Sequence, residues 1–296
     1  MVPALFLYLT LSNDVKDLIA RNDLAAAERT VQAAQKEAGN TPEYAAAVSW
    51  LARGELFANH LERADAYAIE TRKLADQLLH THKLDSDTWL PTAMGAAIEV
   101  HAQVLAARGA RSEAITFLNE QIALFHNSSI ADRLQKNLNL LSLRGKMAPS
   151  LDELDWLGGK PIPLASLHGH AVLLFFWAHW CVDCKAEIPI LADMERIYGP
   201  RGLVLIAPTR YYGYVAGGED APPAVERKYI EAVREKFYSP LGNVSAPLSN
   251  SNFVKYGAST TPTLVLIDGT GVVRLYHPGN LTEPELAAHI QALLPK

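Results

Sequence analysis

The spacing of hydrophobic positions changes near the middle of the chain. From about Asn13 to Leu143, apolar residues recur every three or four positions, alanine is abundant, and runs of β-branched residues are absent. This spacing places the apolar side chains on one face of a helix. After residue 148 the chain shows short apolar runs separated by polar stretches. The pattern predicts a helical domain at 13–145 followed by an α/β domain at 146–296.

Three positions in the helical half resemble one another. Each is a turn-prone residue followed five positions later by an alanine, in the pairs Asn22 and Ala27, Asn59 and Ala64, and Gly109 and Ala114. The pattern resembles the corner of a tetratricopeptide (TPR) hairpin, where a small residue lets two helices approach closely. The corners are unequally spaced and the full TPR signature is missing. TPR-like hairpins are the favoured prediction, and an unrelated helical bundle is the alternative.

The second half predicts a mixed sheet with helices between its strands. Apolar runs indicate strands at 162–167, 171–177, 203–208, 263–268 and 272–276, and helical spacing indicates helices at 182–198, 222–238 and 282–294. The sequence Asp-Gly-Thr-Gly at 268–271 predicts the turn between the last two strands. Residues 144–149, with a glycine and then a proline after the last helix of the first half, predict a linker.

The chain has only two cysteines, Cys181 and Cys184, which directly follow the apolar run 172–176. If Cys181 begins a helix, residues three apart share one face and both sulfurs can meet. Unpaired N–H groups and a partial positive charge at the helix start favour a thiolate, which is the species that attacks disulfides. The pattern predicts thiol–disulfide exchange, with Cys181 as the nucleophile and Cys184 as the resolving thiol.

Two other uses of the cysteines are less well supported. A disulfide across so short a loop constrains little of the unfolded chain, so a purely structural bridge is poorly motivated. A zinc site would need His168, His170 or His179 to complete it, but no second cysteine pair exists and the histidines lack ligand spacing. We expect neither a metal nor another cofactor.

Residues around the cysteines suggest further roles. Trp180 immediately precedes the nucleophile and is expected to cover one side of it as a substrate-binding residue. His179 is expected on the surface, and Asp183, between the cysteines, should raise the pKa of Cys181. Glu187 lies three residues after Cys184 on the same helical face, so its carboxylate is a candidate for the site, with a solvated surface glutamate as the alternative. Trp177 is expected in the core.

The aromatic segment Tyr211-Tyr212-Gly213-Tyr214 follows a predicted strand end. It is expected to be either a wall of a substrate groove or an ordinary surface loop. Nothing in the sequence decides between the two.

From about residue 148 to its end, the chain resembles thioredoxin-fold oxidoreductases of the TlpA/ResA type. The resemblance lies in segments 148–151, 155–160 and 164–169, in the run Trp-Cys-x-x-Cys-Lys-x-Glu-x-Pro that begins at Trp180, and in segment 261–268. The chain departs from that pattern at His179, where a small or polar residue is usual, and at Asp183, where proline is usual.

The resemblance implies roles for three residues. Pro262 would follow Thr261 through a cis peptide bond, leaving the Thr261 backbone open to pair with an extended substrate segment that faces Cys181. The alternative is a trans proline at the entrance of a strand. Glu187 would act as a proton acceptor or would modulate the pKa of the cysteines. The resemblance also favours the periplasm or bacterial cell envelope over the cytoplasm, which is the alternative.

The net charge and the first residues of the chain bear on whether the protein binds nucleic acid or a membrane. The formal net charge is −5 and no polybasic run is present, so nucleic acid is not an expected partner. Residues 1–12 are apolar, lack a positive flank and are shorter than the roughly 20 residues that span a bilayer. They are interpreted as an apolar leader or signal remnant, with possible membrane anchoring, or as a first amphipathic helix.

Three functions compete on these grounds. The leading hypothesis is an envelope thiol–disulfide oxidoreductase that reduces protein disulfides and receives electrons from a thiol donor, with a protein partner on the helical domain. A peroxiredoxin-like thiol peroxidase is the second, although the expected Pro-x-x-x-Thr/Ser-x-x-Cys setting is absent. The third is a non-enzymatic interaction protein with a TPR-like half and a fixed thioredoxin module.

Overall fold

The chain divides into two compact units, Met1–Asn137 and Leu138–Lys296. The computed structural model describes residues 10–294, so most of the expected leader at 1–12 lies outside the described residues. Leu11 and Ser12 already belong to the first helix, where the Trp50 indole N–H donates to Ser12 Oγ at 3.2 Å.

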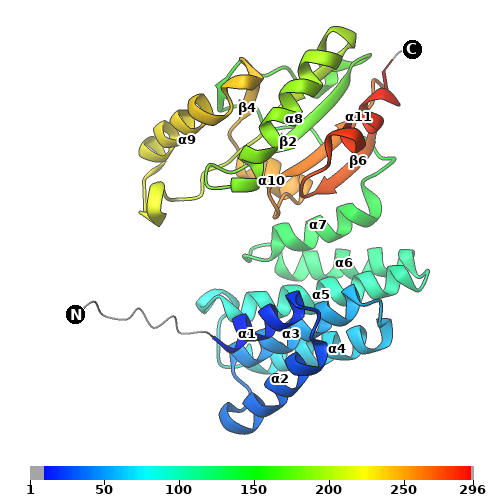
Figure 1. Ribbon diagram of the computed structural model, residues 1–296, viewed down its shortest axis with the longest axis vertical. Coiled ribbons are helices and arrows are strands. Elements are labelled where there is room, and N and C mark those ends of the chain that lie inside the picture. The colour runs from blue at the N-terminus through cyan, green and yellow to red at the C-terminus, as the bar shows by residue number, and fades with distance from the viewer. Residues whose placement is uncertain (1–9, 295–296) are drawn as a thin grey trace. The chain divides into compact units, whose positions relative to one another are not determined.

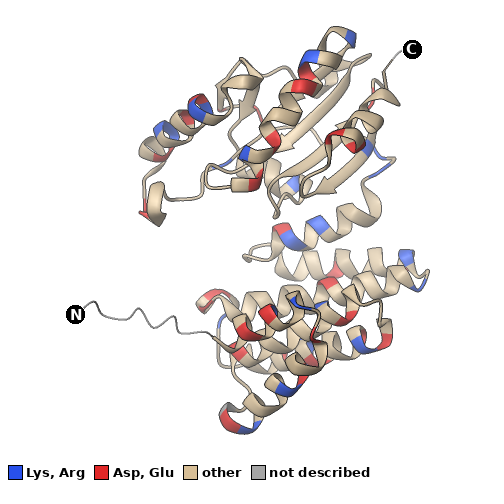
Figure 2. Cartoon of the chain, in the orientation of Figure 1, with Lys and Arg blue, Asp and Glu red and all other residues tan. Residues whose placement is uncertain are grey.

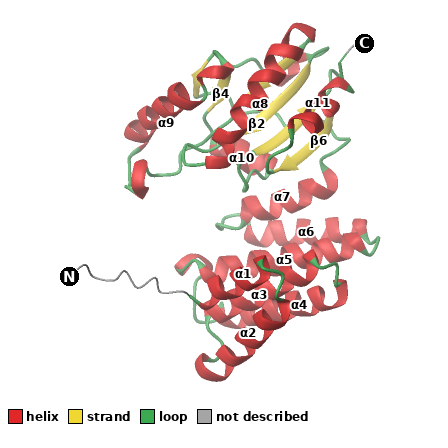
Figure 3. Ribbon diagram, in the orientation of Figure 1, coloured by secondary structure: helices red, strands yellow, loops and turns green. Residues whose placement is uncertain are grey.

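The first unit is built from helices (Figures 1 and 3). Its described elements are α1 (Leu11–Ala20), α2 (Leu24–Ala38), α3 (Pro42–Phe57), α4 (Leu61–Leu78), α5 (Trp89–Ala107) and α6 (Arg111–Phe125), with a 3₁₀ turn at Leu84–Ser86. A further helix, α7 (Ala131–Ser142), begins in this unit and ends in the second. The expected helical fold of the first half is confirmed.

Each of the three corners joins two consecutive helices. Asn22, Asn59 and Gly109 adopt positive φ angles of 59°, 59° and 87°. The alanine five residues after each corner is completely buried, namely Ala27, Ala64 and Ala114. A residue in the left-handed backbone conformation ends the first helix of each pair. The small alanine side chain then lets the second helix pack closely against the first. The hairpins therefore arise from the residues that the sequence pattern singles out.

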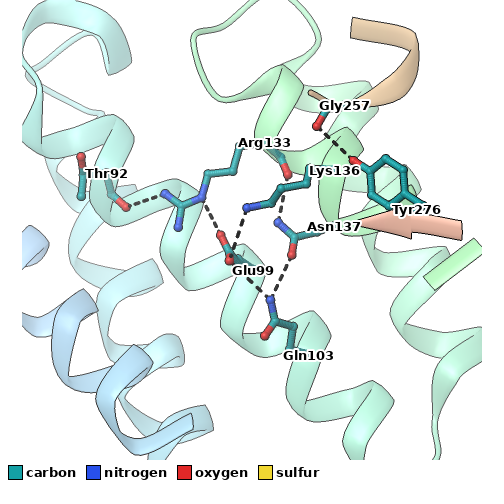
Figure 4. Close-up of polar contacts among 8 residues, drawn as sticks. All are labelled: Thr92, Glu99, Gln103, Arg133, Lys136, Asn137, Gly257 and Tyr276. Carbon is teal, nitrogen blue, oxygen red and sulfur yellow. Dashed lines mark hydrogen bonds and ion pairs between the residues drawn. The ribbon is translucent and has the colours of Figure 1, made fainter. Parts of the chain in front are cut away.

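A polar network links α5 with α7 around Glu99 (Figure 4). Arg133 Nε donates to Glu99 Oε2 at 2.6 Å, and Lys136 Nζ lies 3.8 Å from Oε1. Gln103 Nε2 donates to Asn137 Oδ1 at 3.1 Å beside them. Burial opposes ionisation of Glu99, but the two cations outweigh it, so the pKa of Glu99 lies below its ordinary value.

We expect Glu99→Gln to lower the free energy of unfolding by roughly 3 kcal/mol, because it leaves two largely buried cations without their carboxylate. The contribution is present above the ordinary carboxyl pKa and disappears as the pH falls through the lowered pKa of the folded state, so the deficit should shrink on acidification. Urea denaturation followed by far-ultraviolet circular dichroism measures it.

Glu62→Gln is the matched control. Its side chain is 88% exposed and 3.8 Å from Arg108, so the control should change stability little. Equal effects of the two substitutions would show that the Glu99 network does not stabilise the first unit.

The described residues of the second unit form a six-stranded mixed sheet in the order β1-β4-β3-β2-β5-β6. The strands are β1 (Trp156–Gly158), β2 (Ala171–Phe176), β3 (Leu203–Ile206), β4 (Ser245–Pro247), β5 (Thr263–Ile267) and β6 (Val273–Pro278). β2, β3 and β4 run parallel, while β5 pairs antiparallel with β2 and β6 antiparallel with β5.

Helices cover both faces of this sheet. Leu173 and Phe175 of β2 pack in a core with α8 (Val182–Tyr198), α9 (Pro223–Phe237) and α11 (Glu283–Gln291). The alternate residues Val172, Leu174 and Phe176 pack in a second core with α10 (Asn250–Tyr256). Because both faces are covered, β2 is a continuous apolar run instead of an alternating one.

Several predicted elements differ from the structure. The strand expected at 162–167 is wrong: Leu164–Leu167 forms a 3₁₀ turn, because Pro161 and Pro163 supply no N–H groups to a ladder. The strands β1 and β4 and the helix α10 were not predicted, because runs of three to seven residues are too short to show a period. The last helix ends at Gln291 instead of residue 294.

The segment expected as a linker is part of the second unit. Gly145 N–H donates to Val273 O at 2.8 Å, and Ala148 N–H donates to Gly271 O at 2.9 Å. Leu143 is buried in the core on the α10 side of the sheet. The unit boundary therefore falls eight residues before the expected one at 145/146.

Acidic and basic residues are interspersed on the helices of both units (Figure 2). Within residues 10–294, no helix combines the length and the apolar content that crossing a membrane requires.

Candidate active site

The cysteines lie where β2 leads into α8 (Figure 1). Cys181 is the N-cap of α8 and forms a disulfide with Cys184, with a Cα–Cα distance of 5.3 Å. The Cys184 N–H points at Cys181 Sγ at 3.0 Å. Cys184 is fully buried and Cys181 is 3% exposed. Donation of a helix N-terminal N–H to this sulfur stabilises negative charge there once the disulfide is reduced.

A second segment reaches the same sulfur from β5. The Thr261–Pro262 peptide bond is cis, and the Thr261 carbonyl oxygen lies 3.5 Å from Cys181 Sγ. This proximity follows from strand pairing, since Phe176 at the end of β2 is paired with Thr263 at the start of β5. Residues that follow Phe176 and residues that precede Thr263 must therefore meet at one edge of the sheet.

Glu187 lies inside the protein, not on the solvated helix surface. Its side chain is 1% exposed, and its Oε1 accepts a hydrogen bond from the Leu281 N–H at 3.4 Å. Its Oε2 is buried and has no hydrogen-bond partner among the described residues. Burial raises the pKa of Glu187, and the Leu281 N–H opposes this only in part. Burial thus brings the pKa of this carboxyl, one turn beyond Cys184, closer to that of a thiol, which suits proton exchange between the two groups.

The expectation that His179 lies on the surface is wrong. Its side chain is 1% exposed, and its Nε2 lies 3.4 Å from Oε1 of the equally buried Glu226. Burial lowers the pKa of His179; the Glu226 carboxylate opposes this, and Lys185 adds to it. Burial of the imidazole therefore disfavours a positive charge beside the nucleophile.

The two tryptophans of this segment differ in their environments. Trp177 is completely buried, and its indole N–H donates to Ala207 O at 2.9 Å, as expected for a core residue. Trp180 is 47% exposed, and its ring meets the Tyr212 ring edge-on at a centroid distance of 5.6 Å. Val182, on the other side of Cys181 in the chain, is 75% exposed. The buried sulfurs are therefore flanked by accessible apolar side chains.

The aromatic segment at 211–214 is not a free surface loop. Tyr212 and Tyr214 pack edge-on against His179 at 5.3 Å. The Tyr212 and Gly213 N–H groups donate to the Glu226 carboxylate at 2.5 and 2.9 Å. Sequence reasoning missed Glu226, because a glutamate on a polar helix gives no sign that its side chain points inward.

Within residues 10–294, no three His, Cys, Asp or Glu side chains come together as a metal site. The chemistry at this edge of the sheet is that of the two cysteines. Residues 162–294 match the model of the thioredoxin-like domain family. The C-terminal part of this chain is a thioredoxin-like domain.

Known relatives agree with this result. Over 151 residues, the chain is 28% identical to the thiol-disulfide oxidoreductase ResA of Geobacillus thermodenitrificans (strain NG80-2), covering 51% of this chain and 78% of the relative. It is 30% identical over 162 residues to protein DipZ of Mycobacterium bovis, covering 47% of this chain and 23% of that protein. The enzyme class expected from the sequence, a thiol-disulfide oxidoreductase, is confirmed.

Among solved structures, a thiol-disulfide isomerase from Corynebacterium glutamicum aligns with a TM-score of 0.41 and 16% identity. The alignment covers 51% of this chain and 97% of that one.

We expect Glu187→Gln to gain stability relative to the wild type as the pH rises from 4 to 8. A carboxyl whose pKa is raised on folding contributes stability below its ordinary pKa of 4.5 and loses it as the pH rises through the raised value. The amide has no such proton to lose. Denaturation midpoints of the disulfide forms at the two pH values measure this.

Glu235→Gln, at an exposed position on α9, is the control and should follow the wild type at both pH values. A Glu187→Gln difference that stays constant with pH would mean that burial does not perturb this carboxyl.

Proposed function

We propose that the chain reduces disulfides of client proteins, with Cys181 as the nucleophile and Cys184 as the resolving thiol. The observation that carries the proposal is the position of the pair. Cys181 lies at the N-terminus of α8, faces Thr261, and is the more accessible of two otherwise buried sulfurs. A substrate sulfur can reach Cys181, while Cys184 lies behind it.

The reaction consists of two exchange steps. The Cys181 thiolate attacks one sulfur of the client disulfide, and the other client sulfur leaves as a thiolate and takes up a proton. Cys184 then loses its proton and attacks Cys181 Sγ, which releases the second client thiol and forms the Cys181–Cys184 disulfide. A thiol electron donor reverses these steps on the protein and restores the dithiol.

The other site residues support these steps. Glu187, whose Oε2 has no hydrogen-bond partner in the described part of the chain, accepts the proton that Cys184 releases. The Thr261 backbone before the cis Pro262 pairs with an extended client segment beside Cys181. Trp180 contacts the client beside its disulfide, since nearly half of its surface is accessible.

The proposal also includes a cellular location. We assign the activity to the cell envelope on the strength of the TlpA/ResA resemblance.

The first unit is given a role in binding. The helical hairpins are proposed to be TPR-like and to bind a protein partner. A groove of about 570 Å³ between α4, α5 and α6 supports this, because it combines apolar residues such as Ile98 and Phe117 with polar residues such as Lys73 and Gln77.

Two single-cysteine variants test the proposal. Cys184→Ser should still attack and should accumulate a mixed disulfide with a client, because its resolving thiol is gone. Cys181→Ser should form no such adduct and should have no turnover. Non-reducing electrophoresis and mass spectrometry after incubation with a disulfide-containing protein measure both.

The wild type is the control for turnover, and the double serine variant is the control for non-specific adducts. If Cys181→Ser can be trapped and Cys184→Ser cannot, the assigned roles are reversed and the proposal is wrong.

A further inference from the structure

The exchange reaction leaves one buried titratable pair beside the cysteines unexplained. His179 and Glu226 are both 1% exposed, and removing two ionisable groups from water is costly unless their contacts compensate. Neither belongs to the dithiol, to Glu187 or to the cis-proline segment. Their contacts lead instead to the aromatic segment 211–214 and to α9.

Glu226 anchors that segment through its backbone. Each carboxylate oxygen accepts one main-chain N–H, from Tyr212 at 2.5 Å and from Gly213 at 2.9 Å. A carboxylate that accepts two main-chain donors in a desolvated site holds a loop in one conformation. Since Glu226 lies in the first turn of α9, the segment is attached to a helix of the core.

His179 holds the same segment by packing against tyrosine rings. Tyr212, Tyr214 and Tyr229 meet the imidazole edge-on, with centroid distances of 5.2 to 5.3 Å. Edge-to-face contacts of this kind stabilise the rings in one orientation. His179 is only two residues from Cys181, so the segment is held directly against the turn that carries the nucleophile.

Tyr212 connects this anchor with the accessible surface. The same ring that packs on His179 meets Trp180 edge-on at 5.6 Å, and its hydroxyl lies 3.5 Å from Trp177 O. Trp180 is 47% exposed and Tyr212 is partly exposed. The two rings form an aromatic surface beside the dithiol, which we call the aromatic wall (Trp180 and Tyr212).

We propose that the aromatic wall binds a bulky apolar side chain next to the client's reacting cysteine, and that His179 and Glu226 are positioning residues for Tyr212. This inference rests on the proposed function, because it assumes exchange at Cys181. The substrate class it selects is an extended polypeptide with an aromatic or large aliphatic residue beside its disulfide. Small disulfides that carry no large apolar side chain gain nothing from it.

Three disulfide substrates test the wall. Two are disulfide-containing peptides of equal length, one with phenylalanine and the other with glycine immediately before the reacting cysteine. The third is hydroxyethyl disulfide. We expect the wild type to prefer the phenylalanine peptide by about tenfold in kcat/KM, the scale of one apolar group in a pocket. Tyr212→Ala should lose about that factor through KM on this peptide alone, and Tyr212→Phe should retain it.

The substitutions Glu226→Gln and His179→Asn test whether these residues position Tyr212. If one of the two variants does not fold, the other still provides the test. Each should lower the preference for the phenylalanine peptide several-fold without changing the rate on hydroxyethyl disulfide. Tyr211→Ala is the matched control, since the Tyr211 hydroxyl instead meets Asp155 at 3.3 Å. It should leave the preference unchanged.

Distinct results overturn distinct claims. Equal losses on all three substrates would reduce His179, Glu226 and Tyr212 to structural roles. A wild type that reduces both peptides equally well would refute the wall but leave the proposed function standing. A wild type that reduces none of the three substrates would refute the proposed function itself.

Discussion

The antiparallel pairing of β2 with β5 is the constraint on which the site depends. It sets the end of β2 beside the start of β5, with Phe176 opposite Thr263, and so brings the cysteine turn and the cis-proline segment together. The Thr261 carbonyl reaches within 3.5 Å of Cys181 Sγ although the two residues are 80 positions apart in the chain. Because β2 lies within the sheet and is buried on both faces, a one-residue shift in register would move each of its side chains into the opposite core and disrupt the packing of both.

Glu99 of the first unit and Glu187 of the second lie in contrasting environments. Glu99 is surrounded by cations, which hold it ionised and give the first unit a polar link between α5 and α7. Among the described residues, no cation pairs with Glu187 and its Oε2 has no hydrogen-bond partner, so burial raises its pKa. The neighbours of a largely buried glutamate thus decide the direction of its pKa shift, which is downward for Glu99 and upward for Glu187.

Much of this was predictable from the sequence, and the rest was not for physical reasons. The helix 182–198, the cysteine pair and the three hairpin corners follow from local patterns, and the structure contains each of them. The inward positions of His179 and Glu226 depend on how a loop after β3 folds over a turn after β2. A histidine and a glutamate 47 residues apart carry no periodic signal of that contact. The short strands β1 and β4 were not predicted for a related reason, because only pairing with neighbouring strands of the sheet defines them.

The central claim is that the Cys181–Cys184 pair serves as a reductant of client disulfides. We infer a reducing potential because the carboxylates of Asp183, between the cysteines, and of Glu187, beyond them, disfavour a thiolate at the site when ionised. A less stabilised reduced form makes the disulfide a weaker oxidant. The most direct measurement is the midpoint potential of the pair, obtained by equilibration with glutathione buffers and mass analysis of alkylated protein. The account predicts a reducing value, closer to the roughly −270 mV of thioredoxin than to the roughly −120 mV of a strong dithiol oxidant. A midpoint near the latter value would contradict it and make the protein an oxidase.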